Sequence, residues 1–501
     1  MFIDDMKEKT RHILFYAAAS VLIGVGIHLT QEFRFYNIAA NDLLIYDWAA
    51  VWGTLAKPGG LAALIASFLS QFFCLPVAGT LILSGLYVLC AWLVWKLLSK
   101  MNDRPVMKGL AFFPVVFLFL CMENDYYRFQ GHIAFILVVT ALFAYVSIPE
   151  DKKKLRYAAG IVFIPVLYHL AGSVTAVFAV SIFLWEVCTD GIKGFWALIC
   201  PVVFLLMAFV YVKTSMTAGW ESSLTPFMYY DWPSTYFFPL YAWACVPVLI
   251  LTARLTAGSN VFPRLAVWGH VLSLAVALSL AGYFYDAVHS RSYYRLIQEQ
   301  HLAAEGEWDE IIETADRRQP NYLVSYLNLA LARKGQLVER LGYYNPQPVS
   351  KVMYPTPNLK TGLSLQSAVY LSWGYVSAAR QAAFDANMVT PGMHNPAQLK
   401  ILILTNMALG APEVAEKYLN ILERTLFHRG WAGEMRRALY DSAYEPDELR
   451  RLRNSLPEKG EYVRYDGLKG DMKDILEADP SNEILSQFYT AYQMLETMEE
   501  R

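Results

Sequence analysis

Hydrophobic and polar positions divide this chain into two parts. From His12 to about Tyr285, long apolar runs recur every few dozen residues, whereas from Asp286 onward charged residues appear every few positions. A run of about 20 mostly apolar residues is long enough to cross a bilayer as a helix. The pattern therefore predicts an all-α protein with a polytopic membrane domain over residues 1–285 and a helical domain over residues 286–501.

The apolar runs predict about nine membrane-spanning helices. They cover residues 12–30, 74–98, 107–122, 132–148, 157–172, 174–188, 194–212, 238–254 and 264–285. The run at 107–122 is short, and Pro165, Gly172 and Ser173 leave open a broken or re-entrant helix in place of a hairpin between 157 and 188. Composition agrees, since 55% of the 501 residues are hydrophobic and 15% are aromatic.

Lysine and arginine gather in the loops on one side of these spans. The loops concerned contain Lys7, Lys9, Arg11, Lys96, Lys100, Arg104, Lys108, Lys152, Lys153, Lys154, Arg156, Lys193, Arg254 and Arg264. Short basic loops stay preferentially in the cytoplasm. The amino terminus is therefore expected on the cytoplasmic side of the cytoplasmic (inner) membrane. An odd number of spans then places residues 286–501 on the outer, extracytoplasmic side.

Small residues recur at helical spacing in the C-terminal part. One set is Gly374, Val376, Ala379, Ala383, Ala386 and Pro391; another, about one repeat period later, is Gly410, Ala415, Leu419 and Leu422. Weaker versions surround Gly306 and Gly335. The pattern resembles tetratricopeptide repeats over about half of residues 292–430, which implies stacked helical hairpins that bind a protein or peptide. All six cysteines precede residue 246, so no disulfide is expected in this domain.

Two of the predicted outer loops carry acidic residues. In the first loop, Asp42 and Asp47 precede two amphipathic stretches, separated by "KPGG" at 57–60, that are expected to lie along the outer membrane surface. In the second loop, the apolar runs are joined by "ENDYYRFQ", which contains Glu123 and Asp125. These carboxylates are either solvated turn residues or part of a site.

The layout resembles the membrane glycosyltransferases of the GT-C class, in which outer-loop acids act on sugars linked to polyprenyl phosphate. The resemblance implies catalytic roles for Asp42 and Asp47, with one of them as general base, and binding of a divalent cation (Mg or Mn) by Glu123 and Asp125. It also implies that the cationic residues of these loops neutralise the lipid phosphate; they are Arg34, Lys57 and Arg128. The plan is similar, too, to uncharacterised bacterial membrane families that carry helical repeats.

The sequence leaves open whether the protein is an enzyme. One hypothesis is a glycosyltransferase that binds a membrane lipid or lipid-linked sugar on the outer face. The alternative is a non-catalytic membrane anchor whose helical repeats hold a protein partner. No basic block indicates nucleic acid, and no metalloprotease, hydrolase-elbow, phosphate-loop or dinucleotide-binding motif stands in a credible context. Convergence of the outer-loop acids on one cavity would favour the enzyme.

Overall fold

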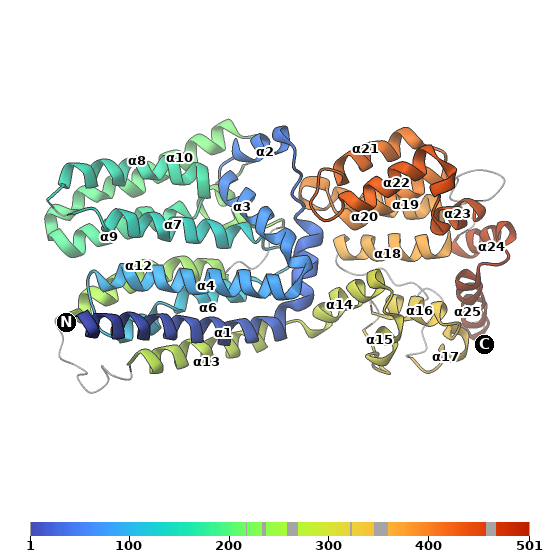
Figure 1. The fold of residues 1–501 in the computed structure, drawn as a ribbon, viewed down its shortest axis with the longest axis horizontal. Helices are drawn as coiled ribbons and strands as arrows, with labels where there is room; N and C mark the ends of the chain where they lie inside the picture. The colour runs from blue at the N-terminus through green and yellow to red at the C-terminus, as the bar shows by residue number, and fades with distance from the viewer. Residues whose placement is uncertain are drawn as a thin grey trace. The chain divides into compact units, whose positions relative to one another are not determined.

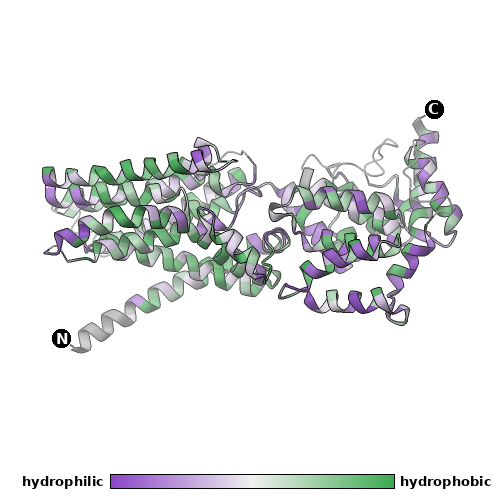
Figure 2. Cartoon of the chain, turned by 90° about the horizontal axis from the view of Figure 1, so that it is seen from above, coloured by the Kyte–Doolittle hydropathy of each residue, from purple (hydrophilic) through white to green (hydrophobic). Residues whose placement is uncertain are grey.

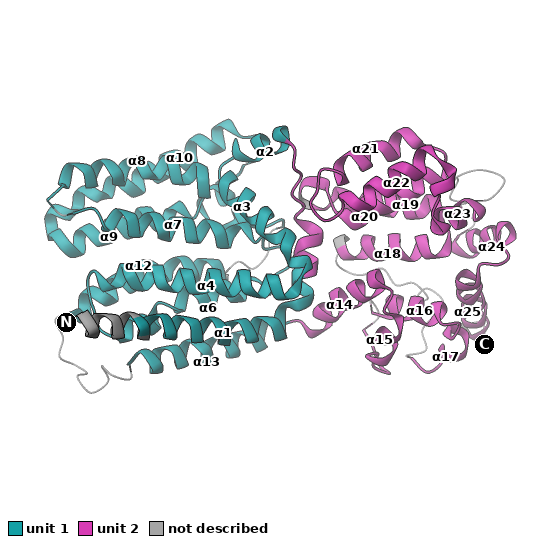
Figure 3. Cartoon of the chain, viewed as in Figure 1, with its two compact units in different colours: residues 1–35, 48–289 teal, residues 36–47, 290–501 magenta. Residues whose placement is uncertain are grey.

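A computed structural model describes residues 2–149, 151–216, 218–232, 237–257, 269–320, 323–344, 359–456 and 467–499. Within these ranges the regular secondary structure is helical, apart from an isolated bridge between Tyr127 and Tyr230, and turns and irregular segments such as residues 42–47 join the helices. It forms two compact units (Figure 3): unit 1 is Met1–Phe35 with Trp48–His289, and unit 2 is Tyr36–Asp47 with Ser290–Arg501. The division after His289 lies close to residue 286, whereas nothing in the sequence indicated that Tyr36–Asp47 joins the C-terminal unit.

Unit 1 consists of apolar helices that run side by side (Figure 1). They are α1 (Phe2–Asn41), α4 (Pro76–Ser99), α5 (Val106–Leu110), α6 (Phe113–Cys121), α7 (Gln130–Val146), α8 (Lys153–Ala171), α9 (Thr175–Asp190), α10 (Ile199–Thr214), α12 (Phe237–Ala257) and α13 (Gly269–Val288). Figure 2 shows apolar residues along most of their length. Five stretches are long and apolar enough to cross a bilayer: His12–Asn41, Pro76–Ser99, Thr175–Thr214, Phe238–Ala257 and Gly269–Val288. The chain is a multi-pass membrane protein.

The stretches that were ambiguous in sequence take definite forms. Helix α8 continues through Pro165, and the chain then turns at Gly172, whose φ is +89°, into α9, which packs against α8. These helices therefore form a hairpin. The stretch Thr175–Thr214 is a second hairpin, because the 3-10 helix Gly191–Leu198 joins α9 to α10. The run at 107–122 is divided into α5 and α6, and residues 264–268 of the last predicted span lie outside the described residues. The count of nine remains a prediction.

The turn after α2 (Trp48–Leu55) and the loops that follow α6, α8 and α10 meet at one end of unit 1, which we call the loop end. Hydrogen bonds tie them together: Gly59 N donates to His169 O (2.8 Å), Gln130 Nε2 to Gly59 O (3.0 Å), Arg128 N to Tyr229 O (2.9 Å) and Ser173 Oγ to Thr225 O (2.8 Å). Because these bonds join loops that are distant in sequence, the loop end is a single connected structure.

The opposite end of unit 1 contains the start of α1. There Lys108 Nζ lies 3.5 Å from His12 Nε2, and Asn102 Nδ2 donates to Ala253 O at 3.2 Å. Helix α13 begins at this end, where Ser273 Oγ lies 3.4 Å from Val106 O, and it finishes at the loop end. His12 and His289 therefore lie at opposite ends of the unit. An odd number of crossings requires this arrangement; which side of the membrane each end occupies stays a prediction.

Unit 2 is a series of shorter helices. They are α14 (Arg291–Glu305), α15 (Trp308–Glu313), α16 (Val324–Arg333), α17 (Leu337–Arg340), α18 (Leu359–Trp373), α19 (Val376–Met388), α20 (Pro396–Ala408), α21 (Pro412–Leu422), α22 (Arg429–Tyr440), α23 (Asp447–Asn454), α24 (Leu468–Ala478) and α25 (Glu483–Glu499). Successive helices from α18 to α22 pack against one another, and α25 packs on α16, α17, α18 and α24.

One turn geometry recurs four times in unit 2. It joins α14 to α15, α16 to α17, α18 to α19 and α20 to α21, at Gly306, Gly335, Gly374 and Gly410, whose φ values are +81°, +69°, +74° and +72°. Each glycine N–H bonds to the carbonyl three residues earlier, and the next N–H to the carbonyl five residues earlier, at 2.7–3.3 Å. This is the Schellman cap, which favours glycine because of its left-handed backbone. All four glycines are those that stood out in the sequence.

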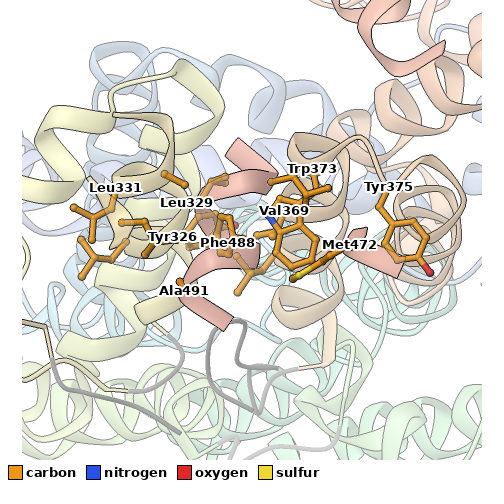
Figure 4. Close-up of a cluster of buried hydrophobic side chains, with 14 of the residues drawn as sticks. Tyr326, Leu329, Leu331, Val369, Trp373, Tyr375, Met472, Phe488 and Ala491 are labelled. Carbon is orange, nitrogen blue, oxygen red and sulfur yellow. The ribbon is translucent and has the colours of Figure 1, made fainter. Parts of the chain in front are cut away.

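Three buried clusters lie among the described residues of unit 2, and the smallest contains Leu302, Ile311 and Ala330. In the first, Trp373 packs on Phe488 and Val369, together with residues of α16, α24 and α25 (Figure 4). The second contains Ala379 and Ala415, both fully buried among residues of α19 to α23. Small side chains at these positions let neighbouring helices approach closely. Unit 2 therefore contains helical hairpins, and their assignment as tetratricopeptide repeats stays a proposal.

Candidate functional site

A buried arginine joins the two carboxylates of the second loop. The guanidinium of Arg34, on α1, places Nη1 3.0 Å from Asp125 Oδ1 and Nη2 2.9 Å from Glu123 Oε2. The Arg34 and Glu123 side chains are only 3% and 2% exposed. Charge-assisted bonds from one planar guanidinium to two carboxylates are both strong and directional. Glu123 and Asp125 are therefore not independently solvated turn residues.

The turn between α6 and α7 holds the two carboxylates in place. Asn124, between them, accepts a bond from the N–H of Tyr126 through Oδ1 (3.0 Å) and one from the N–H of Tyr127 through its backbone oxygen (3.0 Å). The N–H of Asp231 donates to Tyr126 O at 2.8 Å, next to the isolated bridge at Tyr127. Side-chain and backbone bonds of this kind fix a short polar turn.

Two further residues complete this group. His289, directly after α13, places Nδ1 2.8 Å from Glu123 Oε2, and Gln31 Nε2 donates to Glu123 Oε1. The His289 ring stacks on Tyr285, with centroids 4.6 Å apart, and its side chain is 13% exposed. We call Gln31, Arg34, Glu123, Asp125 and His289 the Arg34 cluster. The sequence prediction missed Gln31 and His289, although Gln31 lies three residues before Arg34 and hence on the same helical face.

The cluster is a poor match for the predicted divalent cation. Mg²⁺ and Mn²⁺ sites need several oxygen ligands around one point, whereas here the Arg34 guanidinium lies between the two carboxylates. Among the described residues, no group of three or more His, Cys, Asp and Glu side chains is arranged to hold a metal ion. We therefore assign no metal-dependent step to Glu123 and Asp125.

The first-loop acids belong to unit 2. Asp47 Oδ1 lies 2.8 Å from Arg424 Nη1, and the neighbouring Tyr46 N–H donates to Arg424 O at 2.7 Å. Asp42 follows α1 in the same segment and is half-buried. The structure thus brings Glu123 and Asp125 together, and gives Asp47 a partner of its own. The convergence of Asp42 or Asp47 with the Arg34 cluster stays a prediction.

The other two cationic candidates have different surroundings. Arg128 pairs with Asp231, which the sequence analysis did not connect to it. Lys57 is exposed at the turn between α2 (Trp48–Leu55) and α3 (Gly60–Ser70), and within the described part of the chain it forms no ion pair. Of the three predicted phosphate-binding residues, Lys57 is thus the one whose charge is not neutralised by a carboxylate of the described residues.

A family model matches residues 8–498 of the chain, which is nearly its whole length. The chain belongs to the Family of unknown function (DUF6057). Because the match includes both units, the membrane helices and the helical hairpins belong to one family architecture. No curated protein and no solved structure matches the chain significantly. Function must therefore be argued from the site itself.

Proposed function

We propose that the protein is a membrane glycosyltransferase that takes a sugar from a polyprenyl-phosphate carrier. The observation that supports this is the Arg34 cluster, in which two carboxylates, a guanidinium and an imidazole from three separate segments meet at the loop end of a membrane unit. Buried ionisable groups in membrane proteins are costly and are kept mostly for function. A carrier lipid keeps its phosphate at the interface, so a site at a helix end suits such a substrate.

The reaction would need one proton acceptor and one phosphate site. The acceptor hydroxyl attacks the sugar carbon bonded to the phosphate oxygen, that carbon–oxygen bond breaks, and the polyprenyl phosphate leaves. His289 is suited to take the hydroxyl proton, because Glu123 fixes its ring through Nδ1 as carboxylates do for catalytic imidazoles. Asp42 and Asp47 remain the alternative bases. Lys57 is the proposed phosphate-binding residue, because Arg128, also predicted for that role, is already paired with Asp231.

The test uses the full chain in lipid nanodiscs with polyprenyl-phosphate hexoses whose hexose is radiolabelled, and with a hydroxyl acceptor, either water or an added sugar. We expect the wild type to release polyprenyl phosphate, and Asp125→Asn, which keeps the side-chain volume, to lower that rate by about 100-fold or more. Glu221→Gln is the matched control, since Glu221 also lies at the loop end but outside the cluster. Equal rates in Asp125→Asn and wild type, with unchanged size-exclusion profiles, would remove the support for this function.

The second candidate is a non-catalytic scaffold for a protein partner, and the four recurring glycine turns of unit 2 favour it. Stacked helical hairpins are widely used as binding surfaces. The two candidates differ in what they require of the Arg34 cluster. If none of the labelled hexoses is consumed by the wild type, and Asp125→Asn restores full function in cells that lack the native protein, the scaffold is the better account.

A further inference from the structure

Helix α2 presents an uncovered aromatic surface. None of its residues is buried; the Trp48 and Trp52 side chains are 73% and 54% exposed, and their rings meet edge to face with centroids 5.5 Å apart. Tryptophan is a costly residue to leave in water, because it carries the largest apolar surface of any side chain. A contiguous exposed patch of this kind marks a surface that binds a protein, a ligand or a membrane.

The turn after α2 is fixed rigidly to the membrane helices. Gly59 has φ +77° and bonds to His169 and Gln130 on either side of its peptide. A Cβ on Gly59 would lie 2.8 Å from Gln130 Nε2, and one on Gly60 would lie 2.2 Å from Thr54 O. Helix α3 in turn packs on α2, α7 and α8. The tryptophans of α2 are therefore held outward at a defined place of unit 1.

Other exposed tryptophans of unit 1 lie at the same end. Trp220 and Trp232 are 51% and 65% exposed and belong to the segment after α10 that bonds to the loop end. Among the described residues of this unit, four tryptophans are more than half exposed: Trp48, Trp52, Trp220 and Trp232. At the opposite end, Trp95 is buried beneath Lys96 and Lys108. Tryptophans that gather at one end of a membrane unit are typical of one membrane–water interface, where aromatic side chains are enriched.

We propose that α2 is an in-plane interfacial helix, with Trp48 and Trp52 inserted among phospholipid headgroups and Lys57 facing their phosphates. Lipid is the occupant that the surroundings favour, because α2 is held, through α3, against α7 and α8 of the membrane unit, and the other exposed tryptophans lie at the same end. The inserted rings bury apolar area at the headgroup boundary, and a lysine beside them is attracted to anionic lipid. This inference is independent of sugar transfer.

The position of α2 among the headgroups would also place the Arg34 cluster near the membrane surface. The α2–α3 turn is bonded to Gln130 at the start of α7, and Asp125 lies five residues earlier in the same loop. If α2 lies among headgroups, lipid phosphates surround the loop end at the level of this cluster. A phosphate-linked substrate would then reach it without leaving the membrane surface.

Depth-dependent quenching tests the proposal on the full chain in phosphatidylcholine vesicles. The acyl chains are brominated either near the carbonyl or near the terminal methyl, and the fluorescence of the Trp48→Phe/Trp52→Phe variant is subtracted from that of wild type. We expect the difference signal to be quenched more strongly by bromine near the carbonyl than near the methyl, and weakly by aqueous iodide. Both residues are exposed, so the double variant should fold.

Trp308→Phe is the control, because Trp308 packs on the core of unit 2. Its difference signal should be insensitive to brominated lipid. Gly59→Ala supplies a second measurement: loss of the turn should at least halve the shallow quenching of Trp48 and Trp52. The proposal is overturned if their signal is quenched by iodide and by neither brominated lipid, or equally by bromine at both depths.

Discussion

Glu299 makes unit 2 sensitive to pH near neutrality. Its side chain, on α14, is 1% exposed, and neither carboxylate oxygen accepts a well-formed hydrogen bond from the described residues. Arg295 Nε lies 3.3 Å from Oε1, but the same guanidinium also contacts Asp316 at 2.8 Å and donates to Thr314 O. Burial outweighs this shared arginine and raises the pKa of Glu299 from its ordinary 4.5 to about 8.

The sign and size of the effect follow from proton linkage. Between pH 4.5 and about 8 the folded state holds a proton on Glu299 that the unfolded state has lost. The contribution of Glu299 to the free energy of unfolding is therefore greatest below pH 4.5, and it falls as the pH rises toward the folded-state pKa. The slope approaches about 1.4 kcal/mol per pH unit, which gives roughly 4–5 kcal/mol across the window.

Hydrogen exchange of α16, which packs against α14, measures this loss. We expect the opening free energy of the α16 amides, corrected for intrinsic exchange, to fall by about a few kcal/mol between pH 5 and pH 8. The loss is smaller than the full linkage value because exchange also occurs through partial local opening. Glu299→Gln should remove most of this dependence, because the amide has the shape of the carboxyl group and does not ionise. Glu305→Gln, at the exposed end of α14, is the control. An unchanged slope in Glu299→Gln would refute the reasoning.

Three further predictions concern unit 2 and its location. Gly374→Ala should destabilise unit 2 by at least about 1 kcal/mol more than Gly410→Ala in thermal unfolding. Both glycines have positive φ, but only a Cβ on residue 374 would clash, because it would lie 2.5 Å from the Oγ of Ser455. Ala415→Leu should cost about 1–3 kcal/mol by overpacking a fully buried position, and an unchanged melting temperature would contradict this. A reporter active only in the cytoplasm, fused after Arg501, should be silent.

The elements of this fold that sequence predicted well are those set by local chemistry. Long apolar runs predicted several long apolar helices that the structure shows, because a helix in lipid needs little beyond length and hydrophobicity. The turns at Gly306, Gly335, Gly374 and Gly410 were visible because a left-handed cap selects glycine at one position. The transfer of Tyr36–Asp47 to unit 2 was not predictable, since α1 continues unbroken to Asn41, beyond residue 30 where the first predicted span ends.

The site was harder to predict because its contacts are long-range. Glu123 and Asp125 stood out as a pair of acids, but their partner Arg34 is 89 and 91 positions away, and it was interpreted as a phosphate-binding residue. Asp47 and Arg424 are 377 positions apart. An isolated sequence shows which residues carry charge but not which charges neutralise one another. For this reason the metal and phosphate roles, which depend on uncompensated charge, stay predictions.

The charge balance of the Arg34 cluster limits what it can bind. Glu123 and Asp125 carry two negative charges when ionised, and Arg34 supplies one positive charge. A proton on His289 would balance the second, at 2.8 Å from Glu123. With that proton the cluster is neutral, and without it the cluster is negative, so it does not attract a phosphate in either state. The cluster is therefore better suited to orient a hydroxyl and exchange its proton, whereas phosphate recognition requires a cation elsewhere. Lys57, exposed beside α2, is suited to that second role because no carboxylate of the described chain neutralises it.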